Sequence, residues 1–387
     1  MEKSEIKTIA QKIRITNNII DEMLSKDAFL LAGHKNPDTD CIASLAACAL
    51  LLRKLQKEAA IFLPGPMSEQ FNYLLAICKY NGITVIYGRE TIPSNISVMI
   101  ILDTPKPEMI AMNSAVRVCF EDPAVRKIEI DHHLETDAAY AGDEGYCLVS
   151  SASSTCELIG CLAFKLITMR LKGVKLEDFF TRNIALALLT GVVGDSRMGK
   201  YLKTNKERRI YNAFTTIFDR LLIEKTIKNS RNLASMEDIF DVIQRFSVQE
   251  KKCFDSLVAR KESSRFVAFI YLGKEASAEL FTRYGVEPIV NISKAVADTL
   301  AEESGNLGMV VYHDDKSQSD YVQFRLRRSS QFGALDLRTI LVHCNISNGG
   351  GHPGAIGFRV KEAEIPDSRA YLADLLARID QLVEASR

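Results

Sequence analysis

The sequence predicts an α/β fold: an N-terminal domain built on a parallel sheet with helices on both faces, a helical connector, and a smaller α/β domain at the C-terminal end. Two patterns point to it. Short apolar strands alternate with helical segments up to about residue 130, and strands return after a mostly helical middle part. The length of 387 residues is enough for two domains of ordinary size.

The N-terminal part opens with apolar residues at helical spacing, which predicts an amphipathic helix over residues 4–25. Apolar runs that predict buried strands occur at Ala28–Ala32, Ala60–Leu63, Thr84–Tyr87, Val98–Leu102 and Lys127–Ile130. Helical patterns at Ile42–Lys57 and Glu69–Tyr80 separate the first three of these strands. Strands that alternate with helices are typical of a parallel sheet.

From about Ser153 the pattern becomes helical, with helices expected at 154–171, 176–193 and 205–222. The charged, glycine-poor stretch that follows is interpreted as a helical connector over residues 226–250. It separates an N-terminal domain, residues 1–225, from a second domain, residues 251–387. In the second domain we expect strands at Phe266–Tyr271, Met309–His313, Tyr321–Leu326 and Gly357–Val360, and helices at 287–303, 335–343 and 366–384.

The bulk composition narrows the classes of partner. The net charge is 0, which argues against a protein that binds long nucleic acid, so an anionic partner should be small. The nine cysteines are scattered and form no C-x-x-C pair, as expected of reduced thiols in the cytoplasm. We expect no signal peptide and no membrane span, because the longest nearly apolar stretch, Cys41–Leu52, is too short to cross a bilayer.

Acidic and histidine side chains gather where the predicted strands end. The stretch GHKNPDTDCIAS, residues 33–44, places one histidine and two aspartates directly after the first strand. Three further segments add to the set, which consists of His34, Asp38, Asp40, Asp103, Asp131, His132, His133 and Asp195. Because ligands bind at the carboxyl ends of strands in an open parallel sheet, we expect these side chains to converge there.

Each motif alone also has an ordinary structural explanation. Asp38 or Asp40 suits a helix N-cap, Asp103 before Thr-Pro suits a turn, and Asp195 suits a helix end. Four such segments, each at an element boundary, favour a metal site instead. Carboxylates and imidazoles without thiolate suit Mn, Fe or similar divalent ions. The ligands suffice for two ions, and two ions about 3.5–4 Å apart form a standard centre for phosphoester hydrolysis.

The C-terminal domain carries a second set of candidate residues. Gly349, Gly350, Gly351 and His352 form a glycine-rich stretch whose backbone N–H groups can approach an anion, although a tight turn is the simpler interpretation. In the strand that contains FRLRRS, Arg325 and Arg327 share one face, and Arg328 takes the other. Arginine binds phosphate bidentately, so we expect Arg325 or Arg327 to contact a substrate; a solvated strand edge is the alternative.

These motifs resemble those of the DHH phosphoesterase superfamily. The hallmarks appear in the order His34-x-x-x-Asp38-x-Asp40, Asp103, Asp131-His132-His133 and Asp195. The stretch NGGGHPGAIGF, residues 348–358, is similar to the glycine-rich signature of the DHH-associated C-terminal domain of the first type. The resemblance covers nearly the whole chain. Within the family, the proteins with these two domains include the nano-RNases and pAp phosphatases.

The resemblance implies a role for each residue. His34 and Asp38 would bind a first Mn²⁺, and Asp103 would bridge it to a second. Asp40, His132 and Asp195 would bind that second ion; Mg²⁺ or another divalent cation is the alternative metal. Asp131 would hold an imidazole in its ligating tautomer, and His133 would face the substrate phosphate. Asp103, Asp131 and His133 would thus take part in catalysis, while Arg325, Arg327 and residues 349–352 would bind substrate.

The expected function is a Mn-dependent phosphohydrolase that acts on short oligoribonucleotides and on 3′,5′-bisphosphate nucleotides (pAp) through two-metal activation of water. A cyclic-di-AMP or pApA phosphodiesterase is the alternative, because it would use the same metal centre. Inorganic pyrophosphatase normally has a different C-terminal domain, and a catalytically idle nucleotide-binding protein would not need all the metal motifs. A homodimer is the default oligomeric expectation.

Overall fold

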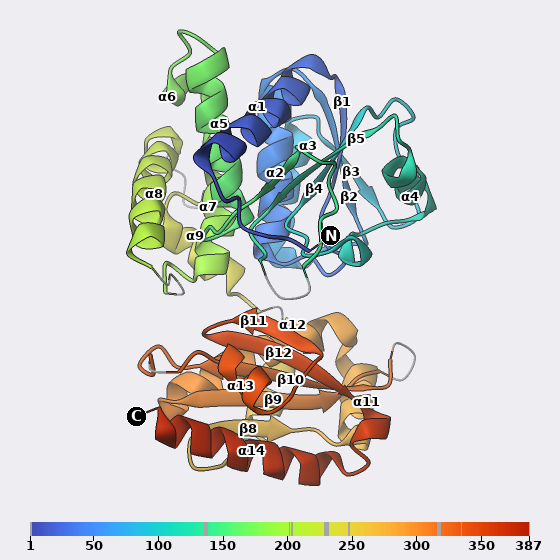
Figure 1. Ribbon diagram of the computed structural model, residues 1–387, viewed down its shortest axis with the longest axis vertical. Coiled ribbons are helices and arrows are strands. Elements are labelled where there is room, and N and C mark those ends of the chain that lie inside the picture. Colours follow the sequence, from blue (N-terminus) through green and yellow to red (C-terminus); the bar gives the residue numbers. More distant parts are fainter. Residues whose placement is uncertain are drawn as a thin grey trace. The chain divides into compact units, whose positions relative to one another are not determined.

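The computed structural model describes residues 2–134, 138–200, 202, 204–227, 232–246, 248–315, 319–333 and 335–386. The chain forms two compact units, Met1–Arg245 and Phe246–Arg387, and each unit contains its own six-stranded sheet (Figure 1). This division confirms the predicted α/β fold class with two sheets. The boundary lies at residues 245/246, within the stretch that was interpreted as a connector, because the helix Met236–Ile243 packs on the first unit.

The sheet of the first unit is entirely parallel, and its strand order is β3-β2-β1-β4-β5-β6. Its strands are β1 (Ala28–Ala32), β2 (Glu58–Leu63), β3 (Thr84–Tyr87), β4 (Val98–Leu102), β5 (Arg126–Asp131) and β6 (Cys147–Val149). Strands β1 and β4 are buried along their whole length. The order reverses between β1 and β4, and the carboxyl ends of the strands beside such a reversal form the usual ligand crevice of this architecture.

Helices cover both faces of this sheet. They are α1 (Ile9–Ser25), α2 (Thr39–Lys54), α3 (Asn72–Tyr80), α4 (Ser114–Glu121), α5 (Thr155–Arg170), α6 (Leu176–Phe179), α7 (Arg182–Ser196), α8 (Asn205–Lys225) and α9 (Met236–Ile243). The large core lies on the face covered by α2, α5 and α7, and a smaller core lies on the face covered by α4. Helix α2 is buried from Asp40 to Leu52, as expected of a helix that is apolar nearly all round.

Several predicted boundaries in this unit differ from the structure. The N-terminal helix begins at Ile9 instead of residue 4, because Thr8 caps it and the residues before it run along another loop. Helix α2 begins three residues earlier than predicted, because the carboxylate of Asp38 caps it. The predicted helix 176–193 is divided into α6 and α7, since Thr181 caps a new helix. Helix α4 and strand β6 were not predicted.

The sheet of the second unit is mixed, with the order β11-β12-β10-β9-β8-β7. Its strands are β7 (Glu262–Ser263), β8 (Val267–Tyr271), β9 (Leu307–His313), β10 (Tyr321–Arg328), β11 (Gly349–His352) and β12 (Ala355–Lys361). Its helices are α10 (Val248–Val258), α11 (Lys274–Tyr284), α12 (Val286–Ser304), α13 (Arg338–His343) and α14 (Ser368–Ala385). Helix α14 packs on one face and α12 on the other.

The glycine-rich stretch is the main difference in this unit. Residues 349–352 form the edge strand β11, paired antiparallel with β12, instead of a tight turn. Helix α11 was also not predicted. Across the residues that the structure describes, no helix combines the length and the apolar character that a bilayer crossing requires.

Candidate metal centre

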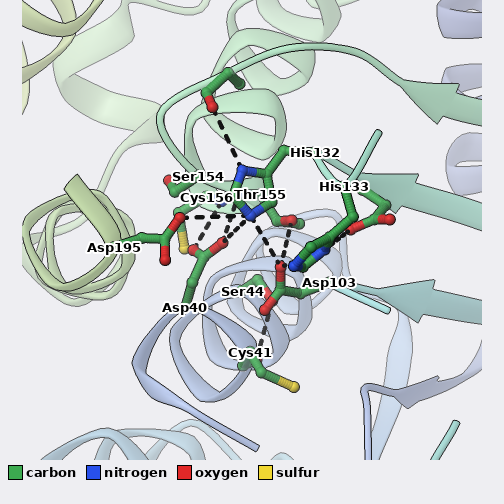
Figure 2. A network of polar contacts seen from close by, with 12 residues as sticks. Asp40, Cys41, Ser44, Asp103, His132, His133, Ser154, Thr155, Cys156 and Asp195 are labelled. Carbon is green, nitrogen blue, oxygen red and sulfur yellow. Dashed lines mark hydrogen bonds and ion pairs between the residues drawn. The ribbon is translucent and has the colours of Figure 1, made fainter. Parts of the chain in front are cut away.

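The acidic and histidine side chains of the first unit meet at the carboxyl ends of its central strands (Figure 2). His34 lies two residues beyond β1, Asp103 directly follows β4, and His132 directly follows β5. Asp40 comes from the first turn of α2, and Asp195 comes from the last turn of α7. The strands on either side of the reversal, together with β5, α2 and α7, therefore bring these residues to one place.

His132 is surrounded by three carboxylates. Its Nε2 atom lies 3.4 Å from Asp195 Oδ2, 3.5 Å from Asp103 Oδ1 and 4.0 Å from Asp40 Oδ2. These separations are longer than hydrogen bonds. They suit donor atoms that share one cation at the usual ligand distances of about 2.0–2.2 Å.

A second group of donors lies on the other side of Asp103. His34 Nε2 is 3.8 Å from Asp103 Oδ2 and 3.7 Å from Asp38 Oδ1. Asp103 thus turns one oxygen toward His132 and the other toward His34. Its backbone lies in the left-handed region, with φ at 50°, and its side chain is almost completely buried. A carboxylate held in this way suits a ligand shared by two ions.

The carboxylates are crowded together at this point, and this crowding affects their pKa values. Burial raises the pKa of Asp195 to about 6, and the neighbouring Asp38 and Asp103 add to this effect while His132 opposes it. Burial also raises the pKa of Asp40 well above its ordinary value, and Asp103 and Asp195 raise it further. Divalent ions would offset the cost of ionising Asp40 and Asp195 in this buried place, so the donors fit a metal cluster chemically.

The N-terminus of α5 supports this group and was missed from the sequence. The backbone N–H groups of Thr155 and Cys156 donate to the two oxygens of Asp40, at 2.6 and 3.2 Å. The Thr155 hydroxyl donates to Asp103 Oδ1 at 3.0 Å. Ser154 caps this helix. The sequence signal was present in the pattern Ser-x-x-Glu at 154–157, which marks a helix N-terminus, and such a terminus favours anions.

Asp131 is buried beneath the ligands and holds one of the two histidines that follow it. Its Oδ1 atom lies 2.8 Å from Nδ1 of His133, and its Oδ2 atom lies 2.5 Å from Nζ of Lys3. Burial alone would raise the pKa of Asp131, but His133 and Lys3 outweigh it and hold the pKa well below the ordinary value. The other histidine, His132, lies 3.4 Å from the carbonyl of Ala152 through Nδ1. Asp131 therefore orients His133. In His132 the Nδ1 atom is on the side of Ala152, and the Nε2 atom faces the carboxylates.

Cys41 lies close to His34 and Asp103 but fits the core better than a ligand set. It is completely buried, and burial raises the pKa of its thiol well above the ordinary value. A neutral thiol is a poor ligand, because metals bind the thiolate.

In the second unit, strand pairing brings the predicted substrate residues together only in part. Arg325 pairs with Gly357, which pairs with Gly350; Arg327 pairs with Ala355, which pairs with His352. Directly paired residues share a face, so Arg325, Arg327, Gly350 and His352 lie on one face, and Gly349 and Gly351 take the other. The three glycines therefore do not all lie on the face that carries Arg325 and Arg327.

The two arginines of this face differ in their contacts. Arg327 Nε lies 3.5 Å from Asp298 Oδ1 on α12, so an ion pair within the unit already engages it. The Nε atom of Arg325 is buried and has no hydrogen-bond partner among the described residues. The Arg325 guanidinium lies over Gly357, where a Cβ atom would come within 2.3 Å of it. Arg328, on the opposite face, donates to the carbonyls of Gly333 and Leu335.

Comparison with known proteins gives a family match. Residues 28–192 match the model of the DHH family, N-terminal domain. These residues contain all the predicted ligands except Asp195. The match covers less than half of the chain and lies within its first unit.

The curated relatives are similar to only part of this chain. A probable manganese-dependent inorganic pyrophosphatase of Bacillus cereus (strain B4264) is 28% identical over 173 residues, which are 44% of this chain and 48% of that protein. A protein of the same description from Bacillus cytotoxicus matches over the same shares. The match thus spans about half the length of these curated relatives.

The fold extends over the whole chain in one solved structure. The crystal structure of an exopolyphosphatase-related protein from Bacteroides fragilis covers 98% of this chain and 99% of its own, with a TM-score of 0.65 and 19% identity. At this identity the likeness concerns the fold.

Proposed function

We propose that the protein is a Mn-dependent phosphohydrolase that acts on short oligoribonucleotides and on 3′,5′-bisphosphate nucleotides such as pAp. The observation that carries the proposal is the convergence of carboxylates and imidazoles at the carboxyl ends of β1, β4 and β5. A site of this composition at the reversal of strand order suits metal-assisted hydrolysis of an anionic substrate.

Two Mn²⁺ ions would be held by the donors that the distances group. His34 and Asp38 would bind one ion, Asp40, His132 and Asp195 the other, and Asp103 both. The opposite orientation of the two Asp103 oxygens supports the bridging role. The relatives described as manganese-dependent support the choice of metal. When bound, such ions acidify water and neutralise phosphoryl oxygens.

The protein's own groups would then orient the substrate. His133 is partly exposed, with a side-chain exposure of 20%, and Asp131 holds its Nδ1 side. The remaining edge of this imidazole would face a phosphate, as expected for a group that donates to a non-bridging oxygen. Thr155 would keep Asp40 and Asp103 in the orientation that binds metal.

Selectivity for nucleotides would come from the second unit. We assign it to the DHH-associated C-terminal domain of the first type on the glycine-rich stretch 348–358. Arg325 is the preferred substrate contact on its face, because Asp298 already pairs with Arg327. A net charge of 0 supports short substrates over long nucleic acid.

Two other substrate classes use the same chemistry. A cyclic-di-AMP or pApA phosphodiesterase has the same metal requirements. Hydrolysis of inorganic pyrophosphate is favoured by the names of the curated relatives, whose similarity covers less than half of this chain. A pyrophosphatase would not depend on a base-binding or nucleotide-binding residue.

The test compares products from an RNA pentamer, pAp, pApA, cyclic-di-AMP and pyrophosphate with Mn²⁺-loaded protein. Loss of mononucleotides from the pentamer together with phosphate release from pAp supports the proposal. Cleavage of cyclic-di-AMP or of pyrophosphate alone supports the corresponding alternative. Asp103→Asn controls for contaminants, because it removes the shared ligand. If it matches the parent on every substrate, the metal assignment is wrong.

Arg325→Met tests the role of the second unit. It keeps much of the side-chain length but removes the phosphate-binding fork, so we expect KM for pAp to rise by about 10-fold or more while kcat changes little. Arg328→Met is the matched control, because Arg328 lies on the opposite face and binds backbone carbonyls.

A further inference from the structure

The first residues of the chain lie against the segment that follows β5. The backbone N–H of Lys3 donates to the carbonyl of Ala138 at 2.8 Å, and Glu2 forms a β-bridge with Ala139. Ser4 exchanges hydrogen bonds with the hydroxyl of Tyr140. A terminal segment is usually mobile unless such contacts hold it in place. Here they set the direction in which the Lys3 side chain enters the protein.

The Lys3 side chain extends to the residues next to the metal ligands, and its ammonium group is fully buried. Its Nζ atom lies 2.5 Å from Asp131 Oδ2, 2.7 Å from Glu129 Oε1 and 2.6 Å from the carbonyl of Thr104. The side-chain exposure of Lys3, Glu129 and Asp131 is 0%. The ammonium group donates hydrogen bonds to Asp131 and to the carbonyl of Thr104, and Glu129 adds an ion pair, so the buried cation has partners on three sides.

Two of these acceptors adjoin the metal ligands. Thr104 directly follows Asp103, the proposed shared ligand, and Asp131 directly precedes His132. Lys3 therefore joins the segments that follow β4 and β5 at the point where each delivers its ligand. Asp131 divides its oxygens between Lys3 and His133. A carboxylate bound at both oxygens is fixed in rotation, and this fixes the imidazole that it holds.

We propose that Lys3 is a positioning residue of the active site, which holds the Asp131 carboxylate so that His133 faces the substrate phosphate. This role rests on the proposed function, because it assigns His133 to the phosphate. The geometric part, that Lys3 sets the orientation and hydrogen bond of His133, holds whichever phosphoester is cleaved.

A simpler role would be neutralisation of the buried Glu129. Glu129 has other partners, however, because its Oε2 atom accepts from the backbone N–H groups of Ala141 and Gly142 at 2.9 and 3.0 Å. Asp131 has Lys3 and His133 as its cationic or donating partners. Loss of Lys3 would leave Glu129 with its two backbone donors on Oε2, while it would free Oδ2 of Asp131, the acid that holds His133.

The experiment uses the full chain with Lys3→Met, which keeps the length of the side chain and removes its charge. The matched control is Lys12→Met, because Lys12 belongs to the same N-terminal segment but donates to Ser150 outside the metal centre. Glu129→Gln keeps the contact between Lys3 and Asp131. The double variant Lys3→Met/Glu129→Gln removes one buried charge of each sign and protects the test against simple misfolding.

Two measurements are made on each folded variant. Steady-state kinetics with the best substrate should give a kcat 10–100-fold lower (roughly) for Lys3→Met and the double variant, with KM within about threefold of the parent. Lys12→Met and Glu129→Gln should keep kcat within about threefold, because neither frees Asp131. Long-range ¹H–¹⁵N spectra of the six histidines, with His133 assigned by His133→Gln, should show a changed Nδ1 signal for His133 in Lys3→Met but not in Lys12→Met.

The spectra separate failure of this proposal from failure of the proposed function. A parent protein without activity on any of the substrates, but with a His133 signal that depends on Lys3, refutes the function and keeps the geometric assignment. Parental kcat and an unchanged His133 signal in Lys3→Met overturn the positioning role. An equal loss of kcat in Glu129→Gln, or recovery in the double variant, assigns Lys3 to neutralising Glu129 and overturns it as well.

Discussion

Replacement of Asp195 by asparagine should stabilise the metal-free protein while it weakens metal binding. The carboxylate of Asp195 lies among other acids, and burial raises its pKa from 3.8 to about 6. A shift of this size corresponds to about 3 kcal/mol of unfavourable free energy for the ionised form, at about 1.4 kcal/mol per pKa unit. The neutral amide avoids that cost but loses the favourable interaction with His132. We therefore expect a gain of about 1–3 kcal/mol in the free energy of unfolding.

Urea unfolding at pH 8 in excess EDTA, followed by the same titration in excess Mn²⁺, measures both effects. In EDTA, Asp195→Asn should unfold at higher urea than the parent. With Mn²⁺ at about 100 times its dissociation constant, the parent should gain about 2.7 kcal/mol per bound site, and the variant should gain less. Glu121→Gln is the control for loss of one negative charge, because Glu121 is exposed on α4. A variant that is less stable than the parent in EDTA, or one that gains as much from Mn²⁺, would refute the electrostatic reasoning.

Three further predictions concern the same centre. In EDTA the free energy of unfolding of the parent should fall by up to about 3 kcal/mol as the pH rises from 4 to 7, because the stability linked to a raised folded-state pKa is lost as the pH passes that pKa. Urea titrations should show that Mn²⁺ abolishes this pH dependence, and a stability independent of pH in EDTA would contradict the raised pKa of Asp195. Gly191→Ala should weaken Mn²⁺ binding at least 10-fold (roughly) in calorimetry, because its Cβ would lie 2.3 Å from Asp40 Oδ1 and 2.4 Å from Cys156 Sγ; unchanged affinity would show that Asp40 is not a ligand. Cys41→Ala should keep the Mn²⁺ affinity within about threefold, because a buried neutral thiol is not a ligand; a large loss would place Cys41 in the metal site.

The sequence predicts the first sheet well for a physical reason. Strands such as Val98–Leu102 are apolar at every position, since both faces of a parallel strand are buried, and the predicted bounds are those of the structure. The position of the candidate ligands follows from the same pattern, because an acid directly after such a strand lies at the sheet edge. Elements with weaker signals, such as the short strand Cys147–Val149, were missed because three residues carry little periodicity.

Other features depend on contacts that local patterns do not contain. Lys3 lies in a charged N-terminal segment and would normally be solvated, whereas its partner Asp131 is 128 residues away. A tight turn was the alternative interpretation of the three consecutive glycines, because glycine is depleted in strands. They form β11 because β12 pairs with them, and at Gly349 a Cβ would lie 2.5 Å from Cβ of Phe358. The burial of Lys3 and the strand conformation of the glycines both depend on tertiary contacts, which the local sequence pattern does not contain.

The charges of the centre also bear on how many ions it would hold. Asp131 is held by Lys3 and His133 and is not a proposed ligand, so it does not enter the count. Four carboxylates remain, those of Asp38, Asp40, Asp103 and Asp195, and the two ligating histidines would be neutral. The N-terminus of α5 offers only about half a positive charge. One divalent ion would leave the group clearly anionic, whereas two would bring it near neutrality, which favours a two-ion centre at a buried site.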